Sequence, residues 1–220
     1  MAESRVASAE PVRRPRGRPR KTPDEVDAGN RRQKLLHAAA RLFRRKGFAA
    51  TTTRDIAAAA GMQSGSPFYH FESKAALLFA VMEQGMRTAL QGQARALEPF
   101  GVEPTGAAPE ALLRTLVRAH FDILLGPGSD FVPVMLYDWR SLTVVQRTGI
   151  AALQRDYESA WAVALHALCE AGRIQVDARA ARLMILGALN WSVQWYKPKQ
   201  DASLDELTEI AMQLFVPRHP

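Results

Sequence analysis

The chain has 220 residues, of which 47% are hydrophobic, and its formal net charge is +7. This apolar content can build a core and excludes wholesale disorder, while the lone cysteine, Cys169, excludes a disulfide framework or a Cys-cluster metal site. The longest uncharged apolar run, residues 183–196, is too short to cross a bilayer, and no apolar stretch follows the basic N-terminus. We therefore expect a cytoplasmic protein without a membrane span or a secretory signal.

The charge is concentrated at one end of the chain. Residues 1–80 contain 16 of the 29 basic side chains and 7 of the 22 acidic ones, whereas residues 81–220 are slightly acidic. Because a basic segment attracts polyanions, this asymmetry favours nucleic acid as the partner of the N-terminal part. A solvated basic surface is the alternative. A membrane surface is disfavoured, because the basic tail has no interleaved Trp, Phe or Leu.

Residues 1–28 are rich in Pro, Arg, Ala and Ser and have no apolar periodicity, so they are predicted to form a disordered basic arm. Within this arm, the segment PRGRPRK at residues 15–21 resembles the core of an AT-hook. Such a hook places slim arginines in a narrow minor groove, and Arg16 and Arg18 are the corresponding residues here. The alternative is a generic basic tail that attracts phosphates without reading a groove.

Capping patterns and glycines divide the next segment into short helices. Asn30 and Gln33 have the spacing of a capping box, which predicts the start of a helix that Gly47 ends. Thr52 and Asp55 repeat this spacing at the start of a second helix. Gly61 ends the second helix, and further helices are predicted from about Gln63 to His70 and from Ser73 towards Leu97.

Residues 52–70 have the pattern of a helix-turn-helix: a short capped helix, a turn containing glycine and a second short helix. The second helix carries small and hydrogen-bonding side chains, as a helix that enters a major groove does. These are Ser64, Ser66, Tyr69 and His70, and Lys74 follows at the next helix start, where a phosphate is favoured. Each residue has a structural alternative: Ser64 supports the turn, His70 is an ordinary surface histidine, and Phe68 and Phe71 belong to the core.

Residues 31–83 read RRQKLLHAAARLFRRKGFAATTTRDIAAAAGMQSGSPFYHFESKAALLFAVME. This stretch resembles the DNA-binding head of the TetR/AcrR family of bacterial transcriptional repressors. The resemblance implies a homodimer that binds a palindromic operator in double-stranded DNA and a body that binds a small-molecule effector, with no cofactor. It assigns Thr52, Tyr69, His70 and Lys74 to phosphates, and Arg54, Ser64, Gly65 and Ser66 to bases or nearby backbone.

Two residues depart from the family pattern. Pro67 stands where the family usually has Leu, Ile or Val, which predicts a helix that starts late or bends, since proline lacks an N–H. Phe68 replaces a common Tyr and removes one expected phosphate contact.

The remainder of the chain also has helical periodicity, with no alternation typical of strands, so the fold class is predicted as all-α. Helices are expected at residues 108–125, 131–146, 148–171, 177–197 and 203–215. The predicted organisation is a disordered arm (1–28), a three-helix DNA-binding head (29–78) and an effector-binding and dimerisation body (79–220), with the boundary near Phe79.

The body contains no catalytic grouping, no paired metal-ligand spacing among its histidines, and no Gly-rich phosphate loop. His120 and His166 are therefore interpreted as packed or surface residues. Large adaptable apolar side chains favour an effector pocket, although most of them must be ordinary core. The candidates are Met82, Met86, Phe121, Met135, Trp139, Trp161 and Leu165, together with Arg140.

Two segments, FVPVMLYDWRSL (131–142) and LNWSVQWYKP (189–198), are similar to a branch of the family that responds to acyl-CoA thioesters and controls lipid or sterol catabolism. This similarity implies that Arg140 or another arginine pairs with CoA phosphates. The last two helices are predicted to form the dimer, through large apolar side chains and a small Gly187 that allows close approach. The proposed interface residues are Leu183, Gly187, Trp191, Trp195, Leu207, Ile210 and Leu214.

The sequence therefore predicts a repressor that a small, largely apolar effector releases from its operator. The alternative is a helical lipid- or acyl-CoA-binding protein with a vestigial DNA-binding head, for which Pro67 and Phe68 are the supporting features. An enzyme is the third hypothesis.

Overall fold

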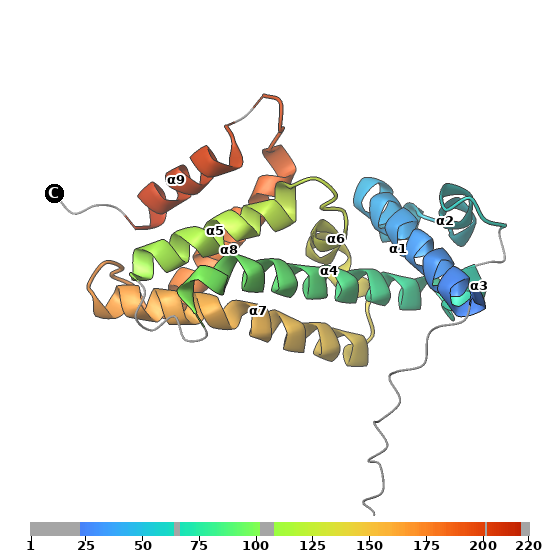
Figure 1. The fold of residues 1–220 in the computed structure, drawn as a ribbon, viewed down its shortest axis with the longest axis horizontal. Helices are drawn as coiled ribbons and strands as arrows, with labels where there is room; N and C mark the ends of the chain where they lie inside the picture. The colour runs from blue at the N-terminus through green and yellow to red at the C-terminus, as the bar shows by residue number, and fades with distance from the viewer. Residues whose placement is uncertain (1–22, 64–66, 102–107, 201, 217–220) are drawn as a thin grey trace, which may run out of the picture.

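The computed structural model describes residues 23–63, 67–101, 108–200 and 202–216, and every regular element in these ranges is helical. In chain order they are α1 (Pro23–Ala50), α2 (Thr53–Ala59), α3 (Pro67–His70), α4 (Lys74–Leu97), the 3-10 helix η1 (Glu98–Phe100), α5 (Pro109–Leu125), α6 (Phe131–Asp138), the 3-10 helix η3 (Trp139–Ser141), α7 (Val144–Glu170), α8 (Ala178–Trp195) and α9 (Leu204–Phe215). The predicted all-α fold, a small N-terminal head on a helical body, is confirmed (Figure 1).

Local hydrogen bonds shape the head. Gly47 interrupts α1 with a φ of 78° and a ψ of 162°, which glycine adopts without a steric penalty. The buried Thr51 then donates its hydroxyl to the Gly47 carbonyl at 2.8 Å. Thr52 and Asp55 form the predicted capping box of α2, and Gly61, with a φ of 69°, follows the end of α2. The breaks expected at both glycines are therefore confirmed.

The start of α1 differs from the prediction. The cap expected at Asn30 is wrong: α1 begins at Pro23, a residue suited to a first helical turn, so Asn30 lies inside a continuous helix. As a result, α1 includes residues 23–28 of the predicted arm, and the remainder of that arm lies outside the described residues. The described part of α3 begins at Pro67, and residues 64–66 lie outside the described residues, so the late start expected from proline stays a prediction.

The body is a bundle in which α4, α5 and α7 pack on one another, with Trp161 of α7 fully buried among them. Helix α4 belongs to both parts of the molecule, because it contacts α1 in the head and α5, α6 and α7 in the body (Figure 1). Gly85 of α4 lies so close to α6 that an added Cβ would approach the Phe131 backbone to 3.2 Å. Helix α8 packs on α5 and α7, and α9 packs on α5.

The helix predicted over residues 131–146 is wrong. Helix α6 ends at Asp138 and passes into η3, and α7 begins at Val144. The reason is a second capping box: Thr143 accepts a hydrogen bond from the Gln146 backbone, and the Gln146 side chain accepts one from the Thr143 backbone. This box starts α7 before residue 148 and leaves α6 as a short helix.

The capping box of α2 gives a stability prediction. Thr52→Ala removes the side chain that accepts the Asp55 N–H at 3.1 Å, so the free energy of unfolding should fall by about 1 kcal/mol. Chemical denaturation followed by circular dichroism measures this change. The matched control is Thr53→Ala at the next position, which should change stability by less than about 0.5 kcal/mol. Equal losses in the two variants would contradict a capping role for Thr52.

Candidate functional site

The face that the sequence assigns to DNA is exposed where the structure describes it. Tyr69 is 92% exposed, Thr52 and Arg54 are exposed, and His70 is half-buried. The Thr52 hydroxyl accepts the Asp55 N–H, and the Thr52 backbone N–H and side chain also hydrogen-bond the Asp55 carboxylate, which lowers the pKa of Asp55. Ser64, Gly65 and Ser66, and Arg16 and Arg18 of the arm, lie outside the described residues.

Lys74 makes contacts within the protein that the sequence did not predict. Its Nζ donates to the carbonyl oxygens of Phe48 and Thr51, both at 2.9 Å, and lies 4.3 Å from the centroid of the Phe48 ring. These contacts tie the start of α4 to the turn between α1 and α2. Since an ammonium group has three N–H donors, one remains for a phosphate.

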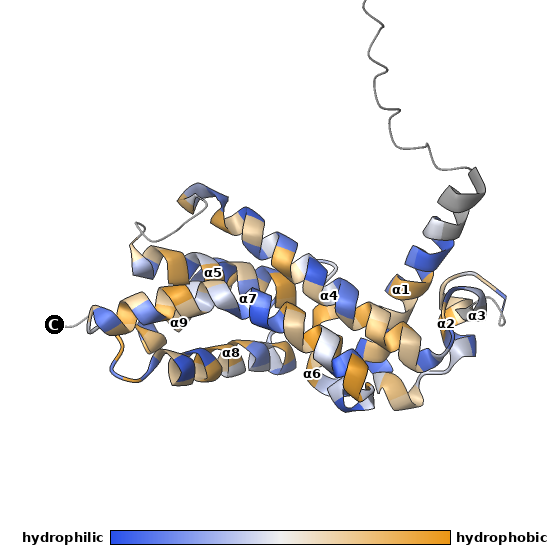
Figure 2. Cartoon of the chain, turned by 90° about the horizontal axis from the view of Figure 1, so that it is seen from below, coloured by the Kyte–Doolittle hydropathy of each residue, from blue (hydrophilic) through white to orange (hydrophobic). Residues whose placement is uncertain are grey.

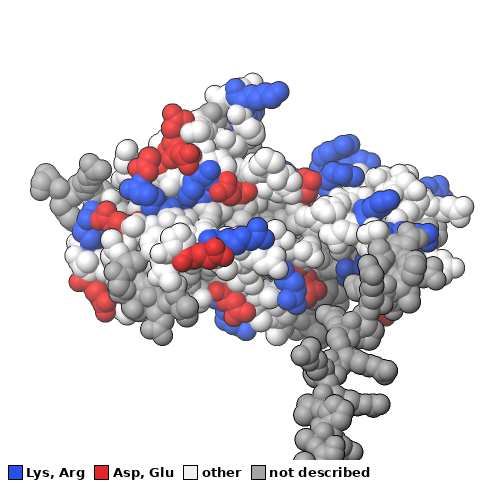
Figure 3. Space-filling view, in the orientation of Figure 1, with Lys and Arg blue, Asp and Glu red and all other residues white. Residues whose placement is uncertain are grey.

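The electrostatic contrast between the two parts is visible on the surface. Lys and Arg side chains gather over the head, whereas acidic and basic side chains are mixed over the body (Figure 3). The exposed basic residues of α1 and α2 are Arg31, Arg32, Lys34, Arg41, Arg44, Arg45, Lys46 and Arg54. The head therefore provides the positive surface that a nucleic-acid backbone attracts.

The head and the body meet through α6. The Phe48 N–H, which the break at Gly47 frees from the helix, donates to the Asp138 carboxylate at 3.2 and 3.3 Å. Burial raises the pKa of Asp138, although the Phe48 N–H and nearby Lys74 act in the opposite direction. Arg44 adds an ion pair with Asp130 at 3.2 Å, just before α6.

The same short helix lines a cavity of about 380 Å³ in the body. Val132, Met135 and Leu136 of α6 form one wall, and Trp139 extends it. The remaining lining comes from α4, α5, α7 and α8: Met86, Ala89, His120, Ile123, Gln154, Tyr157, Glu158, Leu186 and Asn190. Helix α6 thus has one set of residues against the cavity and another against the head.

Three of the eight predicted pocket residues, Met86, Met135 and Trp139, line this cavity. Four others lie in the packed core between helices and do not line it: Met82, Phe121, Trp161 and Leu165. Arg140 is exposed in η3 and is not part of the wall. The correction has a simple cause: apolar periodicity marks the inward face of a helix, but it does not separate a residue at a void from one in solid packing.

The sequence missed the polar part of the cavity. His120 is only 6% exposed, and its Nδ1 lies 2.8 Å from the Tyr157 hydroxyl and its Nε2 lies 3.1 Å from the Asn190 Oδ1. Burial lowers the pKa of His120 to about 4, with the Asn190 contact opposing the shift. Behind this group, Gln93 donates to the Tyr157 carbonyl and accepts from Trp161. No local motif signals this arrangement.

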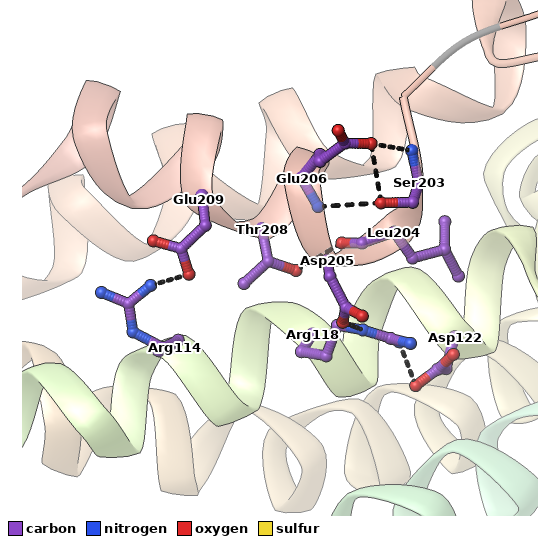
Figure 4. Close-up of polar contacts among 9 residues, drawn as sticks. All are labelled: Arg114, Arg118, Asp122, Ser203, Leu204, Asp205, Glu206, Thr208 and Glu209. Atoms are coloured by element: carbon purple, nitrogen blue, oxygen red, sulfur yellow. Dashed lines mark hydrogen bonds and ion pairs between the residues drawn. The ribbon is translucent and has the colours of Figure 1, made fainter.

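A second hollow of about 810 Å³ lies between α5 and α9. Charged pairs bound it: Arg114 pairs with Glu209, and Arg118 pairs with Asp122 of its own helix and Asp205 of α9 (Figure 4). Since these residues are ion-paired across an open cleft, they hold α9 against α5. The smaller, apolar cavity beside α6 is the better candidate for a ligand site.

The predicted dimer residues divide into two groups. On α8, Leu183, Trp191 and Trp195 are 56%, 65% and 47% exposed, and nothing lies within 4 Å of a Cβ built at Gly187. Apolar residues recur along this helix (Figure 2). On α9, Ile210 and Leu214 are exposed, but Leu207 is only 7% exposed and packs inside its own chain. The packing of α9 on α5 explains why Leu207 is buried within its own chain.

Two family models match the chain. The model described as "Bacterial regulatory proteins, tetR family" matches residues 35–81, and that described as "Tetracyclin repressor-like, C-terminal domain" matches residues 106–217. Together they cover the head and the body.

The chain belongs to the TetR family. It is a DNA-binding transcriptional repressor of this family, whose members are regulators and not enzymes. The HTH-type transcriptional repressor KstR2 of Rhodococcus jostii (strain RHA1) is 29% identical over 84% of this chain and 89% of its own length. No helix in the described part of this TetR-family chain is long and apolar enough to span a membrane.

Two solved structures extend the comparison. AibR in complex with isovaleryl coenzyme A and operator DNA is 25% identical with a TM-score of 0.72, covering 86% of this chain and 100% of that chain. The superantigen PfiT is 35% identical with a TM-score of 0.66, covering 84% of this chain and 95% of that chain. The TetR-family arrangement of head and body is thus found in proteins with different described roles.

The buried histidine predicts how stability depends on pH. The folded state holds His120 with a pKa of about 4, below its ordinary value of 6.5, so the unfolded chain binds more protons in between. The contribution of uncharged His120 to the free energy of unfolding is complete above pH 6.5. It decreases as the pH falls, by about 2 kcal/mol at pH 5. Denaturation at pH 7 and pH 5 should show this loss in the native protein. It should be absent from His120→Gln, and an equal loss in both would contradict the assignment.

Proposed function

We propose that this protein binds its operator as a homodimer and that a small, largely apolar effector in the cavity beside α6 releases it. The observation that carries the proposal is the double contact of α6. Val132, Met135 and Leu136 face the cavity, while Asp138 at its end binds the Phe48 N–H of the head. A ligand that moves α6 therefore acts directly on the group that positions the head.

The proposed switch has two states with different effector affinity. In the DNA-bound state the cavity is small, and α6 keeps Asp138 on Phe48. In the released state the effector fills the cavity and displaces α6, so the heads move from the spacing of successive major grooves. An acyl-CoA thioester of lipid or sterol catabolism is the leading effector class, supported by the ligand of AibR and by the likeness to KstR2. Its acyl part suits a cavity of about 380 Å³, with the CoA part outside.

The DNA contacts follow from the exposed face of the head. We assign Thr52, Tyr69, His70 and Lys74 to phosphates, and Arg54 with Ser64, Gly65 and Ser66 to bases or nearby backbone. Arg16 and Arg18 add contacts from the arm. The exposure of Thr52, Arg54 and Tyr69 supports this assignment. Because its operator is chromosomal DNA, the protein would act in the cytoplasm.

The homodimer is proposed to form mainly through α8. Leu183, Trp191 and Trp195 offer a contiguous apolar surface, and Gly187 lets two such helices approach closely. Ile210 and Leu214 of α9 extend the interface, whereas Leu207 serves the core of its own protomer. A two-fold axis through α8 would place two heads on one palindromic site.

The coupling step can be tested with Asp138→Ala. This variant should bind DNA from upstream of its own gene more weakly than the native protein does, because the head loses the contact that positions it, and should still bind acyl-CoA thioesters within about twofold of the native affinity. The thioester should, however, no longer weaken operator binding, whereas in the native protein it should do so by about 5- to 150-fold. Gel shifts at constant salt measure this effect.

The matched control for this experiment is Asp156→Ala, since Asp156 is exposed on α7 and takes no part in the contact between Asp138 and Phe48. It should retain the full effector response. A native protein with no preference for its upstream DNA over bulk competitor would contradict the repressor itself and favour a ligand-binding protein with a vestigial head. If the thioester released Asp138→Ala from the operator as fully as the native protein, the proposed coupling through α6 would be contradicted.

The dimer interface can be tested with Trp191→Glu. Placing a charge in an apolar interface should produce monomers in sedimentation equilibrium, because an unpaired carboxylate resists burial. Operator affinity should then fall by about 100-fold or more, since two linked heads gain that much from bivalency. Val163→Glu changes an exposed apolar residue of α7 and should leave the protein dimeric. Unchanged association of Trp191→Glu would remove α8 from the interface.

A further inference from the structure

One end of the cavity carries a chain of uncharged polar groups from three helices. His120 of α5 is held between the Tyr157 hydroxyl of α7 and the Asn190 amide of α8, at 2.8 and 3.1 Å. All three residues line the cavity. Buried polar groups are costly unless they are hydrogen-bonded, so a site that served only packing would be better filled by apolar side chains.

The chain of hydrogen bonds leaves one polar group unused. If His120 donates to the Asn190 oxygen, its other nitrogen accepts from the Tyr157 hydroxyl, and both contacts are satisfied. Among the described residues, the Asn190 amide nitrogen then has no hydrogen-bond acceptor, although it belongs to a residue of the cavity wall. An oxygen atom of a bound molecule would complete this arrangement.

The charge of the wall restricts what that oxygen can be. The cavity lining contains one acidic side chain, Glu158, and no Lys or Arg among the described residues. Glu158 accepts from Gln154 at 2.8 Å and pairs with Arg182 at 3.3 Å, so this nearby arginine is already engaged. Burial also keeps His120 uncharged at neutral pH by lowering its pKa to about 4. A carboxylate bound at this end would have no cationic partner.

Apart from Gln154 and Glu158, the rest of the wall is apolar. Met86, Ile123, Met135 and Trp139 offer adaptable aliphatic and aromatic surface on the other sides of the cavity. Two lining residues, Leu136 and Gln154, are exposed and mark the open side. The site therefore combines a largely apolar volume with the polar group of His120, Tyr157 and Asn190.

We propose that this cavity selects compact apolar molecules bearing an uncharged oxygen, as a ketone or hydroxyl group, which hydrogen-bonds to Asn190 beside His120, and discriminates against the corresponding carboxylates. This inference rests on the proposed effector function of the same cavity and specifies its ligand chemistry. For a thioester effector, it places an uncharged part of the acyl group at the polar end and the phosphates outside.

The test uses four compounds with one bicyclic skeleton: tetralin, 1-tetralone, 1-tetralol and tetralin-1-carboxylate. Isothermal titration of the full-length protein at pH 7.5 should show the ketone and the alcohol binding about 3- to 10-fold more tightly than the hydrocarbon, the usual gain from one neutral hydrogen bond. The carboxylate should bind at least about tenfold more weakly than the ketone. Equal affinities, a preference for the carboxylate, or no binding by any of the four would overturn the proposal.

A pair of variants tests whether Asn190 causes the preference for the ketone over the hydrocarbon. Asn190→Leu keeps a similar volume and should reduce the preference for ketone over hydrocarbon to within twofold, while tetralin binds as before. Gln84→Leu makes a comparable change on α4, where Gln84 donates only to Thr88 among the described residues, and should leave the preference intact. Retention of the full preference in Asn190→Leu would also overturn the proposal. The titration of the four compounds against the native protein needs no variant. It therefore tests the proposal even if Asn190→Leu does not fold.

Operator gel shifts with 1-tetralone separate this inference from the proposed function. If the ketone binds with the expected preference and operator affinity is unchanged, ligand selection stands and the effector switch fails for this ligand. If the ketone fails to bind preferentially while an acyl-CoA thioester still releases the operator, the switch stands and the selection rule fails.

Discussion

The joint between Asp138 and the Phe48 N–H is the constraint on which the arrangement of the molecule depends. A half-buried carboxylate needs hydrogen-bond donors, and a backbone N–H at a helix break needs an acceptor. Each satisfies the other at 3.2 Å, and the contact fixes α6 against the end of α1. Because α6 also forms a wall of the cavity, the joint connects the interior of the body to the head without any intervening loop.

The head is held from a second side by α4. Lys74 binds the carbonyl oxygens of Phe48 and Thr51 at the end of α1 and in the following turn, and its charge lies over the Phe48 ring. Helix α4 then continues into the body, where Gly85 brings it against the start of α6. Phe48 is thus contacted both by the first residue of α4 and by the last residue of α6.

The polar group in the cavity wall carries a cost to stability. His120, Tyr157 and Asn190 occupy positions where apolar side chains would pack with less desolvation. The hydrogen bonds among them offset part of this cost, while burial keeps the His120 ring neutral by lowering its pKa. The ion pairs that hold α9 on α5, by contrast, lie at the surface, where such pairs contribute little individually.

The sequence alone determined the features that depend on neighbours a few residues apart. The capping box at Thr52, the breaks at Gly47 and Gly61 and the basic character of the first third follow from local hydrogen bonding, backbone sterics and composition. Even a local capping pattern forms a cap only where a helix starts. The cap predicted at Asn30 was wrong because α1 begins at Pro23 and continues through Asn30. Helical periodicity likewise identified the inward faces of the body helices.

Only the tertiary structure decided which inward residues border a void. Met135 lines the cavity and Met82 is solid core, although both satisfy the same apolar pattern, because the difference lies in the helix opposite. His120 meets Tyr157 and Asn190 across 37 and 70 residues of chain, a separation that no local pattern encodes. In the same way, the rotation of α9 on α5 buries Leu207 and exposes Leu214, because packing between distant segments determines which side of an amphipathic helix faces solvent.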